Sequence, residues 1–116
     1  MILRRWRGAV RAEDAEAYLA HQGETGVRDY RATPGNLGVL VLRRPVGELV
    51  EVITLSLWAS MDDVRRFAGD RPEVAVFYPG DDDLLVEKDP HVDHYEVTDV
   101  DLDPRLRADT SADSPN

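Results

Sequence analysis

The sequence predicts an α+β domain over residues 1–100, and three observations lead to this prediction. The stretch from Leu49 to Ser60 is the longest apolar run and is rich in Val, Ile and Leu, which is typical of a central strand. Segments with apolar residues at helical spacing separate segments in which they recur at every second position. The resulting order of elements is βαββαβ.

The first half of the chain predicts a strand, a helix and a second strand. Residues 2–10 alternate, so five side chains share one face of a strand: Ile2, Arg4, Trp6, Gly8 and Val10. Gly8 indicates a bulge or the close approach of a bulky group. Residues 11–26 are expected to form a helix that Gly23 and Gly26 end. Residues 27–35 are expected to be an irregular connection, and Asn36 to Arg44 a strand.

The second half predicts a hairpin, a helix and a last strand. A reversal at residues 45–47 pairs the second strand with residues 49–59, where Thr54, Ser56 and Trp58 share one face. Ser60 is expected to cap a helix that ends at Ala68, with Asp63 at the capping-box position. Pro72 is expected to open a further helical turn with Val74, Phe77 and Tyr78 facing inward. Residues 84–88 fit either a short helix or an extended segment, and residues 91–100 alternate as a strand.

This order is the ferredoxin-like plan, a four-stranded antiparallel sheet with helices on one face. The strands carry apolar side chains on both faces, because Ile53 and Leu55 oppose Val50 and Val52. One subunit alone would expose a large apolar area, so we expect a homodimer in which two sheets pack face to face. Residues 101–116 lack recurring apolar positions and are expected to form an acidic, disordered tail.

The composition limits the classes of partner. The chain has 23 acidic and 14 basic residues, a net charge of -9, so nucleic acid is not an expected partner. The absence of cysteine excludes disulfides and thiolate metal sites. No apolar run is long enough to span a membrane, and the N-terminus lacks the apolar region of a signal peptide. We therefore expect a cytoplasmic protein that does not bind membranes.

Five short stretches carry a resemblance to a known family: ILRRWRG (2–8), TPGNLG (33–38), SLWAS (56–60), FAG (67–69) and HYEV (94–97). They resemble the antibiotic biosynthesis monooxygenase family of dimeric α+β barrels. The resemblance implies a small pocket between the sheet and its helices. Some members of the family oxidise aromatic polyketides with O₂, without metal or flavin, and others bind and cleave heme.

The heme-cleaving branch of this family uses an Asn on the first strand, a Trp on the second helix and a His that binds the iron. Matched by position, this sequence carries Trp6, Phe67 and Phe77 instead. A phenyl ring cannot bind iron, so heme cleavage is placed well behind the other activities, and no cofactor is expected.

His94 is the candidate general base, because an ordinary pKa of about 6.5 suits removal of a proton from a phenol or an activated C–H. The alternative is a His that is hydrogen-bonded at the dimer seam or a sheet edge. A metal site is not expected, because His91 and Asp93 share a strand face and His94 points the other way. Tyr78 could orient a substrate oxygen, or else pack in the core. Residues 81–83 are expected to form a solvated acidic loop.

The remaining candidates are aromatic or polar side chains that could contact a substrate. Trp6 and Trp58 could stack on a planar substrate, with plain core packing as the alternative. Phe67 and Phe77 recur at helical spacing, which is typical of core residues, and would line the same pocket. Asn36 could reach the pocket with its amide, or it could be present only because Asn tolerates the unusual backbone conformation after the Thr33–Gly35 turn. The strand arginines Arg4 and Arg7 could attract an anion, although exposed arginines usually only solvate a sheet edge.

The leading hypothesis is a cofactor-independent, monooxygenase-like enzyme that acts on a small aromatic or phenolic compound with O₂. The alternative is a non-catalytic homodimer of the same fold that binds a small molecule. Heme binding or degradation is a distant third alternative.

Overall fold

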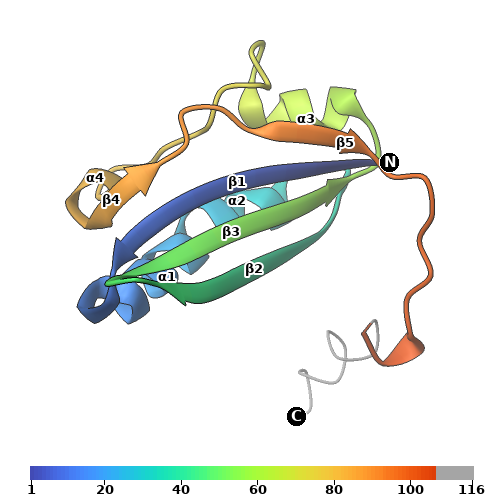
Figure 1. The fold of residues 1–116 in the computed structure, drawn as a ribbon. Helices are drawn as coiled ribbons and strands as arrows, with labels where there is room; N and C mark the ends of the chain where they lie inside the picture. Colours follow the sequence, from blue (N-terminus) through green and yellow to red (C-terminus); the bar gives the residue numbers. More distant parts are fainter. Residues whose placement is uncertain (107–116) are drawn as a thin grey trace.

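The computed structural model describes residues 1–106, which form one antiparallel sheet with helices packed on one of its faces (Figure 1). The strands are β1 (Ile2–Arg11), β2 (Asn36–Val46), β3 (Leu49–Trp58), β4 (Leu85–Lys88) and β5 (Asp93–Glu96). Their order is β2-β3-β1-β4, and β5 also pairs with β1. β4 and β5 pair with successive parts of β1 and together replace a single fourth strand. The expected α+β, ferredoxin-like fold is therefore confirmed.

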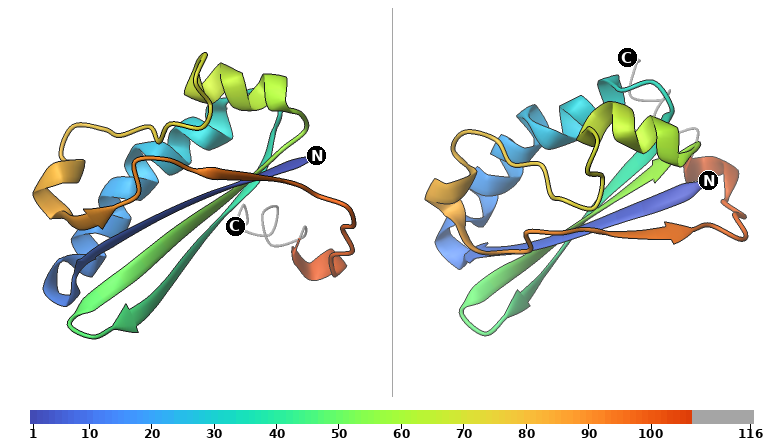
Figure 2. Two further views of the ribbon diagram at one scale, coloured as in Figure 1. Left: turned by 45° about the horizontal axis from the view of Figure 1, so that its top comes forward. Right: turned by 90° about the horizontal axis from the view of Figure 1, so that it is seen from above.

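The helices connect the strands and cover the sheet from one side. They are α1 (Ala15–Glu24), which a short 3₁₀ turn over Ala12–Asp14 precedes, α2 (Gly26–Ala32), α3 (Met61–Ala68) and α4 (Asp81–Leu84). α1, α2 and α3 lie on the same side of the sheet, which we call the inner side (Figure 2). The opposite, outer face carries no helix from the described part of the chain. None of the described helices is long and apolar enough to cross a bilayer.

The connection between α1 and β2 differs from the sequence-based expectation. Residues 27–35 were expected to be irregular, but α2 extends through them as far as Ala32, and Gly23 lies inside α1. The physical reason is tertiary packing of Tyr30, whose ring lies 4.5 Å from the Phe67 ring and 6.0 Å from the Trp58 ring. Burying this side chain stabilises a helix that local signals alone do not predict.

The segment over residues 71–80 is also different, because it is an irregular loop rather than a helical turn. Its backbone groups bond to the chain before β5: Ala75 N–H donates to the Pro90 carbonyl, and Val92 N–H donates to the Glu73 carbonyl. These bonds replace the helical ones that Pro72 was expected to start. Phe77 faces the buried Trp6 ring but is only partly buried, with 38% of its surface exposed. The last strand, expected over residues 91–100, is limited to β5.

The prediction for α3 is confirmed at both ends. Ser60 is its N-cap, and the Ser60 hydroxyl accepts a hydrogen bond from Asp63 N–H. Gly69 follows the helix with φ +87°, a conformation that a residue with a side chain rarely adopts.

A layer of polar side chains divides the core. Along the inner face of β3 the residues run Val52, Thr54, Ser56 and Trp58, and all four are buried. Val52 belongs to one apolar cluster with Trp6, Val10 and Tyr18, while Trp58 belongs to a second cluster with Tyr30 and Val64. Arg4 on β1 and Gln22 on α1 lie at the same level and are also buried. Four buried polar side chains thus separate the two apolar clusters.

Candidate functional site

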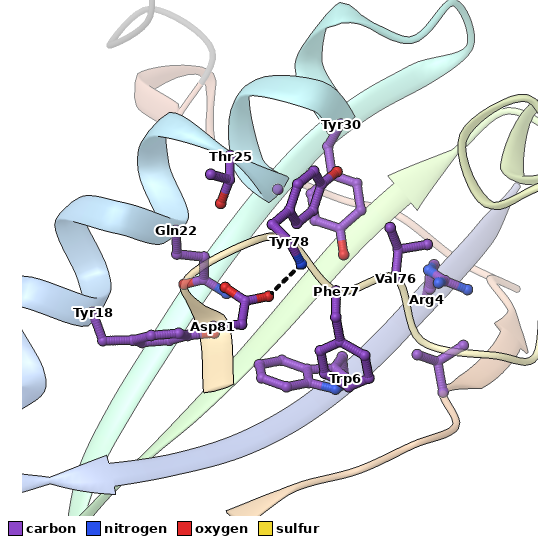
Figure 3. A pocket seen from close by; sticks show the side chains of 12 residues that line it. Arg4, Trp6, Tyr18, Gln22, Thr25, Tyr30, Val76, Phe77, Tyr78 and Asp81 are labelled. Atoms are coloured by element: carbon purple, nitrogen blue, oxygen red, sulfur yellow. Dashed lines mark hydrogen bonds between the residues drawn. The ribbon is translucent and has the colours of Figure 1, made fainter. Parts of the chain in front are cut away.

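A small hollow lies at this polar layer, between the inner face of the sheet, α1 and α2, and the loop over residues 71–80 (Figure 3). Its volume is about 30 Å³, room for one or two water molecules. The lining comes from every element around it: Arg4 and Trp6 from β1, Tyr18 and Gln22 from α1, Tyr30 from α2, Phe77 and Tyr78 from the loop, and Asp81 from α4. The hollow therefore combines aromatic walls with buried polar groups.

Trp6 forms one wall and is fixed from two sides. Its indole N–H donates to the Asp89 carbonyl at 2.9 Å, and its ring meets Phe77 edge-on with ring centres 6.1 Å apart. A Cβ added at Gly8 would lie 2.5 Å from Trp6 Cη2, so only glycine leaves room for the ring. The expectation that a bulky group approaches Gly8 closely is therefore confirmed.

Arg4 is buried, with only 2% of its surface exposed, contrary to the interpretation of this residue as an exposed strand arginine. Its guanidinium donates to the backbone carbonyls of Pro72 and Val74, and Nη1 lies 3.2 Å from His94 Nε2. The side chain is held inside by the loop that crosses the sheet at this point. Burial lowers the pKa of Arg4 from its ordinary value, and the neighbouring Tyr30 hydroxyl opposes this effect.

Two tyrosines add hydroxyl groups to the site. Tyr30 is buried, and burial raises the pKa of its phenol, although Arg4 and Ser56 act in the opposite direction. The Tyr78 hydroxyl donates to Asp29 Oδ2 at 2.8 Å. Burial is the main cause that raises the pKa of Tyr78, and the hydrogen bond to Asp29 raises it further. Both phenols are therefore neutral hydrogen-bonding groups near neutral pH.

Asp81 anchors the loop to the helices. It is buried, its Oδ1 lies 2.7 Å from His21 Nε2, and its Oδ2 accepts a hydrogen bond from Tyr78 N–H (Figure 3). The expectation of a solvated acidic loop is thus wrong for Asp81. The reason is that Gly80, with φ +96°, turns the chain so that this carboxylate meets the end of α1.

His94 lies beside the hollow rather than in its lining. It pairs with Arg4 across β5 and β1, and its Nε2 faces the Arg4 guanidinium. Burial is the main cause that lowers the pKa of His94 from its ordinary value, and the positive charge of Arg4 lowers it further. The ring is therefore neutral near pH 7, with Nε2 as a hydrogen-bond acceptor.

The other candidates divide into those that line the hollow and those that do not. Trp6, Phe77 and Tyr78 line it. Trp58 is fully buried in the second apolar cluster and donates to the Ser56 hydroxyl at 2.9 Å. Phe67 packs on Tyr30 and Trp58 in the same cluster. The Asn36 side chain accepts a hydrogen bond from Arg31 and donates one to the Leu57 carbonyl, so its amide stabilises the start of β2.

The residues of the hollow do not fit a heme. Phe77 stands where the resemblance implies an iron ligand, and no His belongs to the lining. The two histidines nearby are engaged, His94 with Arg4 and His21 with Asp81. Within residues 1–106, moreover, no three His, Asp or Glu side chains gather as a set that could hold a metal ion.

Comparison with solved structures shows which proteins share this fold. A protein from Bacillus cereus, provisionally described as an antibiotic biosynthesis monooxygenase, superposes with a TM-score of 0.60 at 14% identity, over 88% of this chain and 97% of its own. An uncharacterised NIPSNAP-like domain protein from Burkholderia xenovorans gives 0.57 at 17% identity, over 88% and 89%. A variant of MhuD with two manganese protoporphyrin IX groups per active site gives 0.55 at 18% identity, over 87% and 99%.

These similarities define a class by its fold. The chain has the ferredoxin-like α+β fold of antibiotic biosynthesis monooxygenase-like proteins, as the sequence resemblance led us to expect. At these identities they establish the fold alone. No protein-family model matches the sequence, and no curated protein matches it either.

Proposed function

We propose that the protein is a cofactor-independent, monooxygenase-like enzyme that acts on a small aromatic or phenolic compound in the hollow. The observation that supports this proposal is the polar layer within the core. Arg4 Nε and Gln22 Oε1 are buried and have no hydrogen-bond partner in the described part of the chain. Each such atom costs about 1–3 kcal/mol of stability, so a core selected only for stability would avoid them. A ligand with polar substituents would satisfy both atoms.

The chemistry of this proposal needs no external electron donor. A base removes a proton from a phenol or an activated C–H, and the resulting electron-rich anion reacts with O₂. When a CH₂ group becomes a carbonyl, one oxygen atom enters the product and the other leaves as water. The substrate supplies all four electrons, so the protein contributes only a base, an orienting group and a dry cavity.

Three residues have proposed roles in this reaction. His94 accepts the proton once the hydrogen bond between its Nε2 and Arg4 is broken. The Tyr78 hydroxyl orients a substrate oxygen, and the Trp6 ring forms the wall on which the substrate stacks. Because the hollow has room for only one or two water molecules, we propose that the substrate enters by displacing the partly exposed ring of Phe77, which then leaves an aromatic-sized space beside Trp6.

Oxygen uptake with anthrone-type substrates tests the enzymatic proposal. We expect consumption above the rate without protein, and a large decrease in the His94→Ala variant. Equal rates in the two proteins would remove His94 from the mechanism. No uptake above background with the wild-type protein would contradict the proposal as a whole.

The second candidate is a non-catalytic protein that binds a small molecule, and the small volume of the hollow favours it. In this case an aromatic ligand would bind at the same place, and the wild-type protein would leave the rate of oxygen consumption unchanged.

We also infer that two copies pack through their outer sheet faces. The register places Leu40 opposite Leu55, Leu42 opposite Ile53 and Leu3 opposite both Leu57 and Tyr95. All these side chains are on the outer face, where Leu40 is 54% exposed and Tyr95 51% exposed. One end of the same face carries Glu51 between Arg7 and Arg44, at 2.7 and 2.6 Å. Arg5, opposite Leu55, forms a further ion pair with Asp93 on this face, at 3.6 Å. Apolar side chains bordered by ion pairs are the composition expected of an interface between subunits.

A further inference from the structure

Arg4 is the most deeply buried charged side chain of the described residues, and all its partners are uncharged. It contacts two backbone carbonyls and the neutral ring of His94, and its Nε–H has no partner. No carboxylate of residues 1–106 forms a salt bridge with it, although the half-buried Arg5 and Arg7 on the same strand do form such bridges. A chain with 23 acidic residues thus leaves this buried cation without a counter-ion.

A buried cation without a counter-ion is unfavourable, because the protein interior solvates a charge much less well than water does. The two carbonyl acceptors and the face of the Phe67 ring, whose centre lies 5.7 Å from the guanidinium, compensate only in part. The acidic groups nearest the hollow are engaged elsewhere, Asp81 with His21 and Asp29 with Tyr78. The free donor of Arg4 therefore remains available to an anion that comes from outside the chain.

The surroundings of Arg4 suit one kind of anion. Trp6 and Phe77 offer aromatic surface in the same hollow, and the Tyr30 hydroxyl lies beside the guanidinium. Gln22 Oε1 is a buried acceptor that can receive a hydrogen bond from a second substituent of the ligand. An aromatic ring with one ionised oxygen to accept from Arg4 and a second, hydrogen-bond-donating substituent for Gln22 would therefore satisfy each of these groups.

We propose that Arg4 is the specificity-determining residue of the hollow and that it selects ligands whose aromatic ring bears an anionic oxygen, such as phenolates. This inference rests on the proposed function, because it names the class of compound that the same site accepts. The ligand oxygen would accept a hydrogen bond from Arg4 Nε–H. A hydrogen bond to a charged group stabilises an anion far better than a neutral ether of the same shape.

The test compares 4-nitrophenol with its methyl ether, 4-nitroanisole, which has the same ring and no ionisable proton. We expect the wild-type protein to bind 4-nitrophenol about tenfold to a hundredfold more tightly, the range expected for a hydrogen bond to a charged group. At a pH where the free phenol is half ionised, its absorption spectrum should shift toward the phenolate form on binding. This comparison uses only wild-type protein and so does not depend on the folding of a variant.

Arg4→Met should abolish both the preference and the spectral shift. Arg5→Met is the matched control, because it removes the same charge from the neighbouring position on the outer face and should change neither. An equal effect of both variants would show only a long-range effect of charge and would overturn the assignment to Arg4. Equal or tighter binding of 4-nitroanisole would overturn the anion site while leaving small-molecule binding intact. Binding of neither compound to the wild type would contradict the proposed function as well.

Discussion

Arg4 and His94 face each other from neighbouring strands, and this contact determines the charge that each carries. Burial lowers the pKa of both groups, and the charge of Arg4 lowers that of His94 further. Because a guanidinium stays protonated at any physiological pH, His94 is the partner that remains neutral. A neutral His94 can accept a hydrogen bond from Arg4, and protonation of its ring would place two positive charges 3.2 Å apart.

We therefore predict a dependence of stability on pH that comes from His94. Its folded-state pKa lies below the unfolded value of about 6.5, so the unfolded chain binds more protons between these two values. The contribution of His94 to stability is complete above this window and decreases as the pH falls through it. Urea unfolding at about pH 7.5 and about pH 5.5 measures the effect.

His94→Gln is the appropriate comparison for this prediction, because its amide oxygen can still accept from Arg4 but does not titrate. The loss of unfolding free energy between the two pH values should be smaller in this variant than in the wild type. The other two histidines are present in both proteins, so the difference reports His94 alone. The same loss in both proteins would show that the environment of His94 has no such effect.

The sequence identified some residues of the hollow and missed others for identifiable reasons. Trp6, Phe77 and Tyr78 were candidates, and all three line the hollow. Alternation along β1 placed Arg4 on the same face as Trp6, but a charged side chain is so rarely buried that the exposed interpretation was preferred. Tyr30 was missed because it lies in a segment that was expected to be irregular.

β1 supplies one wall of the hollow, and its geometry depends on the absence of a side chain at Gly8. We predict that Gly8→Ala lowers the free energy of unfolding by about 1–3 kcal/mol, the cost of overpacking a core. The new Cβ would lie 2.5 Å from Trp6 Cη2 and would displace the indole. Gly38→Ala on β2 is the control, because a Cβ there meets no atom within 4 Å. Equal effects of the two substitutions would refute this account of Gly8.

The loop over residues 71–80 closes the hollow, and Phe77 fills the space beside Trp6. We predict that Phe77→Ala increases the association rate of an aromatic ligand such as 4-nitrophenol, because the ring that must be displaced is absent. Stability should change little, since Phe77 is 38% exposed. Stopped-flow measurement of binding gives the rate. A slower association in the variant would show that Phe77 recruits the ligand instead of blocking it.

Elements whose limits depend on local signals were predicted well, and elements that depend on distant contacts were not. α3 has a capping serine and a terminal glycine, and both act as expected. α2 depends on the packing of Tyr30 against Trp58 and Phe67, which are distant in sequence. The loop over residues 71–80 depends on backbone bonds to residues 90–92. Such pairings leave no periodic pattern in the sequence.

For the whole molecule, the order of elements was sufficient to predict the fold. βαββαβ allows few topologies in which every strand pairs, and the ferredoxin-like arrangement is among the commonest. The division of the last strand into β4 and β5 was not predicted, because residues 90–92 between them bond to the loop over residues 71–80, and such distant pairings leave no local signal. The prediction of a disordered tail concerns residues 101–116. Residues 101–106 are exposed, and residues 107–116 lie outside the described residues.

The outer face of the sheet leads to the prediction on which the whole account depends. If a second copy covers this face, a charge among its apolar side chains should separate the subunits. Leu40→Glu places a carboxylate on the β2 side of this face, and Leu102→Glu adds the same charge to a leucine of similar exposure in the segment after β5. Only the first substitution should weaken the dimer, because desolvating an unpaired carboxylate at an apolar interface is strongly unfavourable.

Sedimentation equilibrium of the wild-type protein at micromolar concentration is the most direct measurement. The account predicts a mass of twice 13.0 kDa for the wild type and for Leu102→Glu, and a single subunit for Leu40→Glu. A folded wild-type protein that sediments as a single subunit under these conditions would contradict it.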